Sequence, residues 1–168
     1  EVLEECEGIE SELEKLVTER ENIEVTLADL DPWKSLASPV EELGQLEKTA
    51  CLAGLLPSQN YEQAVELVDE VGGVIEHFGL TDKRYACLIV CFIEDITKVH
   101  KLLRSVDFEQ TGFDHLSGTV VELIEEYSEK LTLTKSQIKD HRESLKSLAD
   151  NYLNLLILND HYANLLSR

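Results

Sequence analysis

The sequence predicts an α+β protein in which a small α/β lobe is inserted between the two arms of a long antiparallel coiled-coil hairpin. Three observations lead to this fold class. A heptad pattern of apolar residues occupies each end of the 168-residue chain. Between the ends, strand-like apolar runs alternate with helical patterns in the order β-α-β-β-α-β. The two heptad segments carry opposite charge, which favours pairing of one with the other.

The C-terminal heptad segment, residues 119–168, is predicted as one helix of about fifty residues, or roughly 75 Å. Its apolar or seam-compatible side chains recur in alternating steps of four and three, which is typical of a coiled-coil seam. Thr119 and Glu122 form a capping box that starts the helix, and no Pro or Gly follows Gly118. The predicted seam includes Ile124, Leu131, Ile138 and Leu145.

The N-terminal heptad segment, residues 1–30, shows the same alternation and provides the partner helix. It holds ten Glu and only two basic residues up to Glu24, whereas residues 130–146 hold five basic residues and two acidic ones. In an antiparallel pairing the acidic stretch faces the basic one and Arg20 lies near Lys130; the alternative is two unrelated solvated faces. The predicted seam of this segment includes Leu13, Leu16, Ile23 and Leu27.

In this register the first helix ends opposite about Asp150, so residues 151–168 have no partner within the chain. The sequence also opens within a heptad and without an initiating Met. We therefore expect upstream residues of a longer protein to cover this end, which in isolation drives self-association or frays. The exposed unpaired side chains are predicted to include Tyr152, Leu155, Leu158 and Tyr162.

The middle of the chain has the element order of a ferredoxin-like lobe. The first and third strands, which are central in that arrangement, are the most apolar. The third is apolar on both faces, so either the linker or a partner must cover the second face of the sheet. We predict an outbound helix over 1–30, a linker over 31–48, a lobe over 49–116 with strands at 49–56, 74–80, 85–93 and 108–113 and helices at 60–71 and 94–106, and a return helix over 117–168.

Two features of the lobe are candidate docking surfaces for a partner protein. Edge strands offer unpaired backbone for strand addition, and the linker carries the single Trp of the chain, Trp33. The alternative for Trp33 is that it covers the core of the lobe. The candidate docking residues are Trp33, Val74, Glu76, Phe78 and Phe113.

Composition and motifs indicate no catalytic, cofactor-binding or metal-binding role. The formal net charge of −19 repels nucleic acid. The five His are not spaced with Cys or acids as a metal site requires, no Gly-rich phosphate loop is present, and the loop after the first strand lacks an Arg for phosphate. We expect the four Cys to be reduced. A regulatory lobe that senses a small ligand at a dimer interface remains an alternative.

Several short stretches, in their order and spacing, resemble the soluble arm of subunit I (subunit a in eukaryotes) of archaeal and bacterial V/A-type rotary ATPases. They are LDPWKSL at 30–36, PVEELG at 39–44, GLLP at 54–57, LLRSVDFE at 102–109 and LSGTVVE at 116–122. The family often has Pro after the Gly-Thr of the last stretch, where this chain has Val120. Pro is favoured but not required in the first turn of a helix.

The resemblance implies a non-catalytic stator part of an ion-translocating rotary ATPase or ATP synthase, at the cytoplasmic face of the membrane. It implies that this chain is the distal lobe with part of the coiled coil, and that the lobe docks the peripheral stalk, an E/G heterodimer, against rotor torque. The other implied partner is the remainder of its own subunit, which is a proximal lobe and a membrane domain.

The prediction that residues 151–168 drive self-association can be tested by introducing charged side chains there. Replacing Leu155 and Leu158 by Lys should abolish self-association, because the apolar surface is then charged, while the lobe stays folded. Sedimentation velocity with circular dichroism measures both. Retained dimers would show that the contact lies elsewhere.

Overall fold

The computed structural model describes residues 2–44 and 47–166. The chain divides into two compact units. We call Glu1–Val25 with Ser128–Arg168 the arm, and Thr26–Tyr127 the lobe. The predicted combination of helices with an antiparallel sheet, an α+β protein, is confirmed. The lobe is longer than the predicted 49–116, because the linker and the adjoining helix ends pack onto the sheet.

The sheet of the lobe has four antiparallel strands in the order β2-β3-β1-β4. The central strands β1 (Thr49–Pro57) and β3 (Arg84–Phe92) pair along their whole length. The edges are β2 (Val74–Thr81) and β4 (Glu109–Gln110). Asp82 and Lys83 both have positive φ, 46° and 64°, as a tight turn between β2 and β3 requires.

The fourth strand is shorter than the predicted 108–113 and pairs with β1 only at Gly54 and Leu55. Gly54 is needed there because a Cβ would lie 2.4 Å from the Phe108 ring and from the Glu109 carbonyl oxygen. The Thr111 N–H still donates to the Ala53 carbonyl of β1 at 2.8 Å. After Thr111, Phe113 packs into the second core of the lobe instead of extending the edge.

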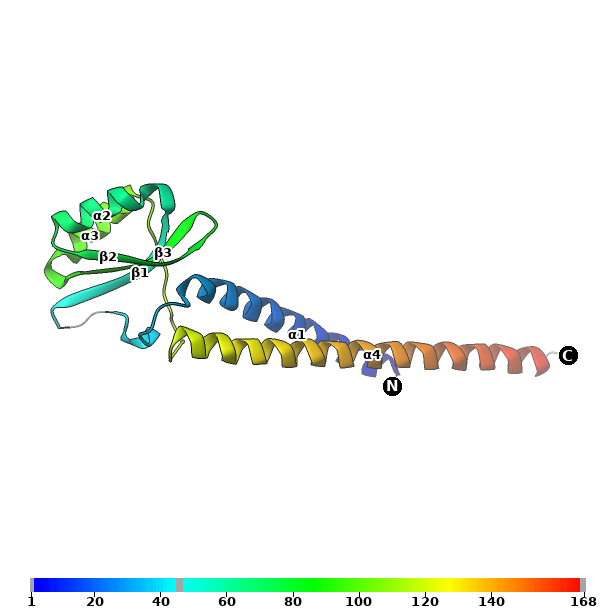
Figure 1. Cartoon of the computed structure of the whole chain (residues 1–168). Helices are drawn as coiled ribbons and strands as arrows, with labels where there is room; N and C mark the ends of the chain where they lie inside the picture. The colour runs from blue at the N-terminus through cyan, green and yellow to red at the C-terminus, as the bar shows by residue number, and fades with distance from the viewer. Residues whose placement is uncertain (1, 45–46, 167–168) are drawn as a thin grey trace. The chain divides into compact units, whose positions relative to one another are not determined.

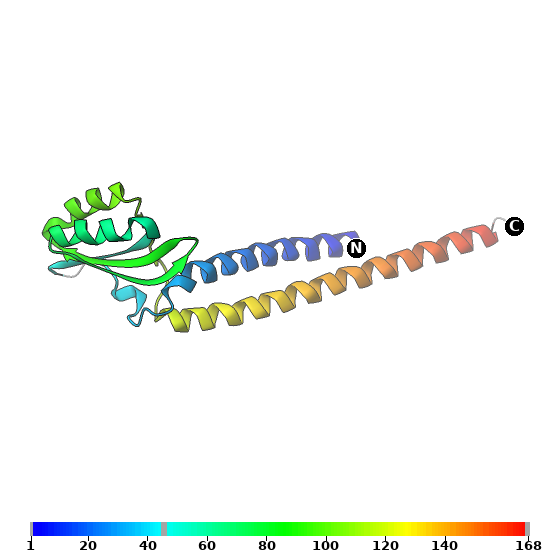
Figure 2. The ribbon, with the colours of Figure 1, turned by 45° about the horizontal axis from the view of Figure 1, so that its top comes forward.

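Helices α2 (Tyr61–Glu70) and α3 (Ile96–Ser105) lie together on one face of the sheet (Figures 1 and 2). Alternate residues of β1 and β3 point toward these helices and form the first core. Gly72, with a φ of +71°, follows α2 and lets the chain turn out of the helix. The largest fully buried side chains of this core are Leu56, Val68, Ile89, Val99 and Val106.

The linker covers part of the second face of the sheet and forms a second core. Its two short 3₁₀ turns are η1 (Asp31–Trp33) and η2 (Val40–Glu42). Trp33 is completely buried, with its ring edge-on to Phe113 at 5.3 Å and tilted against Phe78 at 6.1 Å between centroids. Of the two coverings that the sequence left open, the linker therefore supplies one. The buried residues of the second core are Leu30, Trp33, Leu36, Val40, Ala53, Ala86, Val120 and Leu123.

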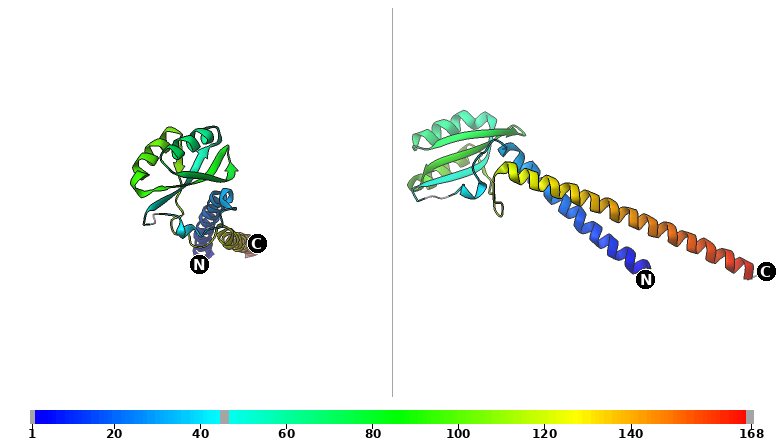
Figure 3. Two further views of the ribbon diagram at one scale, coloured as in Figure 1. Left: turned by 60° about the vertical axis from the view of Figure 1, so that its left-hand side comes forward. Right: turned by 60° about the horizontal axis from the view of Figure 1, so that its bottom comes forward.

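The arm is built from the two long helices, α1 (Val2–Leu30) and α4 (Val120–Leu166), whose remaining residues belong to the lobe. Figure 3 shows α4 continuing past the start of α1. Between 128 and 150 every side chain is exposed except six that are three and four residues apart, a heptad spacing. Those six are Leu131, Thr134, Ile138, His141, Leu145 and Leu148. No helix in the described part of the chain has the length and hydropathy needed to cross a membrane.

The second core makes a stability prediction. Trp33→Ala removes a fully buried side chain, and should lower the free energy of unfolding by about 3–5 kcal/mol. Lys34→Ala, at an exposed neighbouring position, should change it by less than about 0.5 kcal/mol. Urea unfolding measures the free energy of unfolding of both variants, and far-UV circular dichroism follows it without using Trp fluorescence. Equal stability of the two variants would contradict the role of Trp33 as a core residue.

Candidate docking surface of the lobe

The five candidate docking residues fall into two groups. Trp33, Phe78 and Phe113 pack together in the second core: Trp33 has no exposed surface, and the two Phe rings are partly buried beside it. These three side chains are occupied in holding the linker on the sheet. Val74 and Glu76, at the start of the edge strand β2, are exposed, Val74 to 68%. The surface that remains for a partner therefore lies at the start of β2.

The far half of β2 is tied to the linker rather than open. The Ser35 hydroxyl donates a hydrogen bond to the Phe78 carbonyl, with 3.1 Å between oxygens. Next to Phe78, a Cβ on Gly79 would lie 2.3 Å from the Pro32 carbonyl oxygen, so only Gly allows this close approach. The strand is also irregular between His77 and Gly79. Such irregularity and covering protect an edge strand from unwanted pairing.

The other end of the linker is fixed by Glu41. Its carboxylate accepts hydrogen bonds from the Gly118 backbone N–H at 2.7 Å and from the Ser117 hydroxyl at 2.9 Å. The Val40 N–H donates to the Gly118 carbonyl at 3.0 Å. The Gly118 N–H, the Glu41 backbone N–H and the Ser117 hydroxyl together lower the pKa of Glu41. This contact joins the linker to the start of α4, and no local pattern predicts it beyond an acid near a turn.

The start of α4 has the capping box that the sequence predicts. The Thr119 N–H donates to the Glu122 carboxylate at 2.9 Å, and the Glu122 N–H donates to the Thr119 hydroxyl at 3.3 Å. The hydrogen bonds from the Thr119 N–H and hydroxyl lower the pKa of Glu122. Gly118, with a φ of +109°, makes the sharp entry into the helix.

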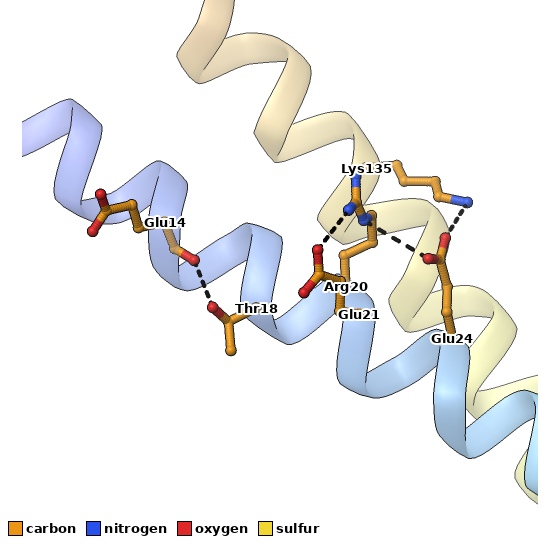
Figure 4. Close-up of polar contacts among 6 residues, drawn as sticks. All are labelled: Glu14, Thr18, Arg20, Glu21, Glu24 and Lys135. Atoms are coloured by element: carbon orange, nitrogen blue, oxygen red, sulfur yellow. Dashed lines mark hydrogen bonds and ion pairs between the residues drawn. The ribbon is translucent and has the colours of Figure 1, made fainter.

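A cross-helix ion pair links the two helices of the arm. Lys135 of α4 lies 3.0 Å from Glu24 of α1, and Arg20 contacts Glu21 and Glu24 (Figure 4). Exposed pairs of this kind contribute about 1 kcal/mol or less. The side chains of the predicted seam differ in depth. In the arm, Ile23 and Ile138 are buried, and Leu13, Leu16, Leu131 and Leu145 are partly buried. Leu27 and Ile124, which belong to the lobe, are also partly buried.

The register of the arm differs from the predicted one. Arg20 lines a hollow of about 330 Å³ together with Lys135, Lys139 and Arg142, which lie further along α4 than the predicted neighbour Lys130. Apolar periodicity alone fits several such registers, because shifting one helix by a heptad leaves the seam unchanged. At the far end of α4, Tyr152 is 49% exposed, and the side chains of Leu155, Leu158 and Tyr162 lie outside the described residues.

In the described parts of the lobe and the arm, the side chains that could bind a metal ion or act as nucleophiles are not arranged to do so. Within residues 2–44 and 47–166, no group of His, Cys, Asp and Glu is arranged to hold a metal ion. The four cysteines are free, and burial raises the pKa of the Cys87 thiol to about 12. Burial also raises the pKa of Cys51 and Cys91, so these thiols stay protonated and unreactive near neutral pH.

Comparison with known proteins gives a likeness of fold. No family model matches the sequence, and no curated protein matches it. Among solved structures, the chain is similar to the cytoplasmic N-terminal domain of subunit I, homolog of subunit a, of V-ATPase, with a TM-score of 0.58 and 16% sequence identity. The match covers 90% of this chain and 51% of that one, so this chain spans about half the length of that domain.

The Glu41 contact makes a prediction about pH. The pKa of Glu41 is lowered by folding, so its contribution to stability is present above the unfolded pKa, near 4.5, and is lost as pH falls through the lower folded value. Glu41→Gln should therefore reduce stability at neutral pH and flatten the loss of stability on acidification. Urea unfolding from pH 7 to pH 3 measures this. A pH dependence of stability that is unchanged in Glu41→Gln would refute the role of the contact.

Proposed function

We propose that this chain is part of a stator arm of a V/A-type rotary ATPase, in which the lobe docks the peripheral stalk and resists rotor torque. The observation that carries the proposal is the fold likeness of nearly the whole chain to a subunit I domain of V-ATPase. The short stretches quoted from the sequence support the same family independently, because they were identified without the structure.

We infer further that the lobe is ferredoxin-like and that the arm is an antiparallel coiled-coil hairpin. The element order, the strand order β2-β3-β1-β4 and the position of α2 and α3 on one face support the first point. The heptad spacing of the buried side chains on α4 and the Lys135–Glu24 pair support the second.

A stator part must transmit force without performing chemistry. The 47 residues of α4 correspond to a helix of roughly 70 Å, and a second helix beside such a rod stiffens it. The lobe adds a small domain with two cores, one on each face of the sheet. On this proposal the ion-translocating machinery belongs to other parts of the parent enzyme, and this chain works at the cytoplasmic face of the membrane.

The proposed partners are the E/G heterodimer of the peripheral stalk and the remainder of the same subunit. The lobe is the proposed docking unit for the stalk, because it combines a rigid core with exposed side chains at the start of β2. The arm is the proposed link to the rest of the subunit, because the fold likeness covers 51% of the subunit I domain. The competing function is a regulatory module whose lobe senses a small ligand.

A binding experiment separates the two functions. The immobilised chain should bind a purified E/G stalk heterodimer at low salt, with an affinity in the micromolar range or tighter, as expected for a specific interface. Biolayer interferometry measures the affinity, and an unrelated protein of similar net charge on the sensor controls for electrostatic adsorption. Absence of binding, combined with a shift in melting temperature on adding a small-molecule library, would favour the regulatory function instead.

A further inference from the structure

The second face of the sheet is covered over only part of its length. Residues that pair across strands share a face, and so do residues two apart along a strand. Ala86, Leu88, Val90 and Phe92 of β3 therefore all lie on this face. Ala86 and Leu88 pack into the second core. Beyond them Val90 is 40% exposed and Phe92 is 55% exposed, so the cover ends between Leu88 and Val90.

The uncovered part extends from β3 to the edge strand β2, whereas Cys51 of the neighbouring strand β1 is partly buried. Val74 of β2 pairs with Val90, and Val90 pairs with Cys51 of β1, which places the three side chains in one row on the second face. Directly paired side chains of this kind are about 5 Å apart. Phe92 lies in the next row, paired with Thr49. We call Val74, Val90 and Phe92 the apolar patch.

The three exposed side chains of the apolar patch are neighbours on this face of the sheet. Val74 is paired with Val90, and Phe92 is two residues further along β3. The side chains of Val74, Val90 and Phe92 are exposed by 68%, 40% and 55%, respectively, although the backbones of all three residues are paired within the sheet. Apolar side chains grouped in this way on a folded domain mark interaction sites, whereas isolated ones do not. Burial of such surface against apolar side chains of a partner favours binding.

The surroundings of the patch are mainly acidic. Phe92 lines a hollow of about 500 Å³ together with Glu47, Lys48 and Glu94, and with Asp95, whose carboxylate is 2.6 Å from the Lys98 ammonium. On the other side, Glu76 is exposed on the same face as Val74. Carboxylates thus lie beside Phe92 and beside Val74, and the opposing charges are Lys48 in the hollow and Lys98, which is paired with Asp95.

The charges decide between the possible occupants. The same patch on a second copy of this chain would bring the same acidic rim, so two such patches would repel each other. A segment of a partner protein with apolar side chains flanked by Lys or Arg meets both requirements, because it buries the patch and neutralises the rim.

We propose that the apolar patch docks a segment of a partner protein that presents two or three apolar side chains flanked by basic residues. This inference rests on the proposed function, for which it specifies the surface of the lobe and the chemistry of the stalk segment. The aromatic residues of the second core take no part in the contact, because they are occupied in holding the linker.

The test compares two double variants of the full chain. Val74→Ser with Phe92→Ser removes the exposed apolar groups of the patch. Val25→Ser with Leu133→Ser removes side chains of similar exposure, 60% and 61%, from the arm. We expect the patch variant to bind the E/G heterodimer at least about tenfold more weakly than wild type, and the arm variant to bind within about twofold. Circular dichroism melts verify that both variants are folded.

A measurement on the wild-type chain keeps the test valid if the patch variant unfolds. Hydrogen exchange with and without the heterodimer should show protection of residues 74–76 and 90–94 in the complex. Wild-type binding with an unaffected patch variant, or protection elsewhere only, overturns the patch while leaving the stalk role standing.

Failure of the proposed function gives a different result. If wild type does not bind the heterodimer, the stalk role fails, and the patch is then tested with a synthetic amphipathic peptide of Leu and Lys. Saturable binding to wild type that the patch variant loses supports the patch. Equal binding to both proteins, or none, overturns it.

Discussion

The burial of Trp33 is the contact on which the second layer of the lobe depends. The indole fills the space between the linker and the sheet, and it contacts Phe78 from the edge strand and Phe113 from the segment after β4. A side chain of this size in a fully desolvated site contributes several kcal/mol. Because three separate segments meet on one ring, the linker is held as part of the lobe and not as a loose connection.

Fixing the linker also determines which surfaces the lobe exposes. Ser35 and Pro32 lie against the far half of β2, while Glu41 ties the other end of the linker to the start of α4. The cover therefore ends between two rows of the sheet, and the apolar side chains beyond it remain in water. An acidic rim around an apolar surface favours a basic partner at that surface and disfavours its pairing with the same surface of a second copy.

Much of the secondary structure could be predicted because it follows from local patterns. The long helices follow from heptads, the two central strands from short apolar runs, and the start of α4 from the Thr119 and Glu122 pair. The length of β4 could not be predicted, since the choice of Phe113 between the edge strand and the Trp33 site depends on a residue eighty positions away. The register of the arm was missed because a heptad pattern repeats.

The sequence by itself determined the order of the elements, the two-faced apolar character of β3 and the absence of recognisable catalytic motifs. Only the tertiary structure decided what covers each face of the sheet. Phe78 and Phe113 are packed in the second core, whereas Val74 is exposed. No local pattern in the sequence predicts this difference, because all three are apolar residues in or next to an edge strand of the sheet. Burial is a property of what packs above a residue, and that comes from distant parts of the chain.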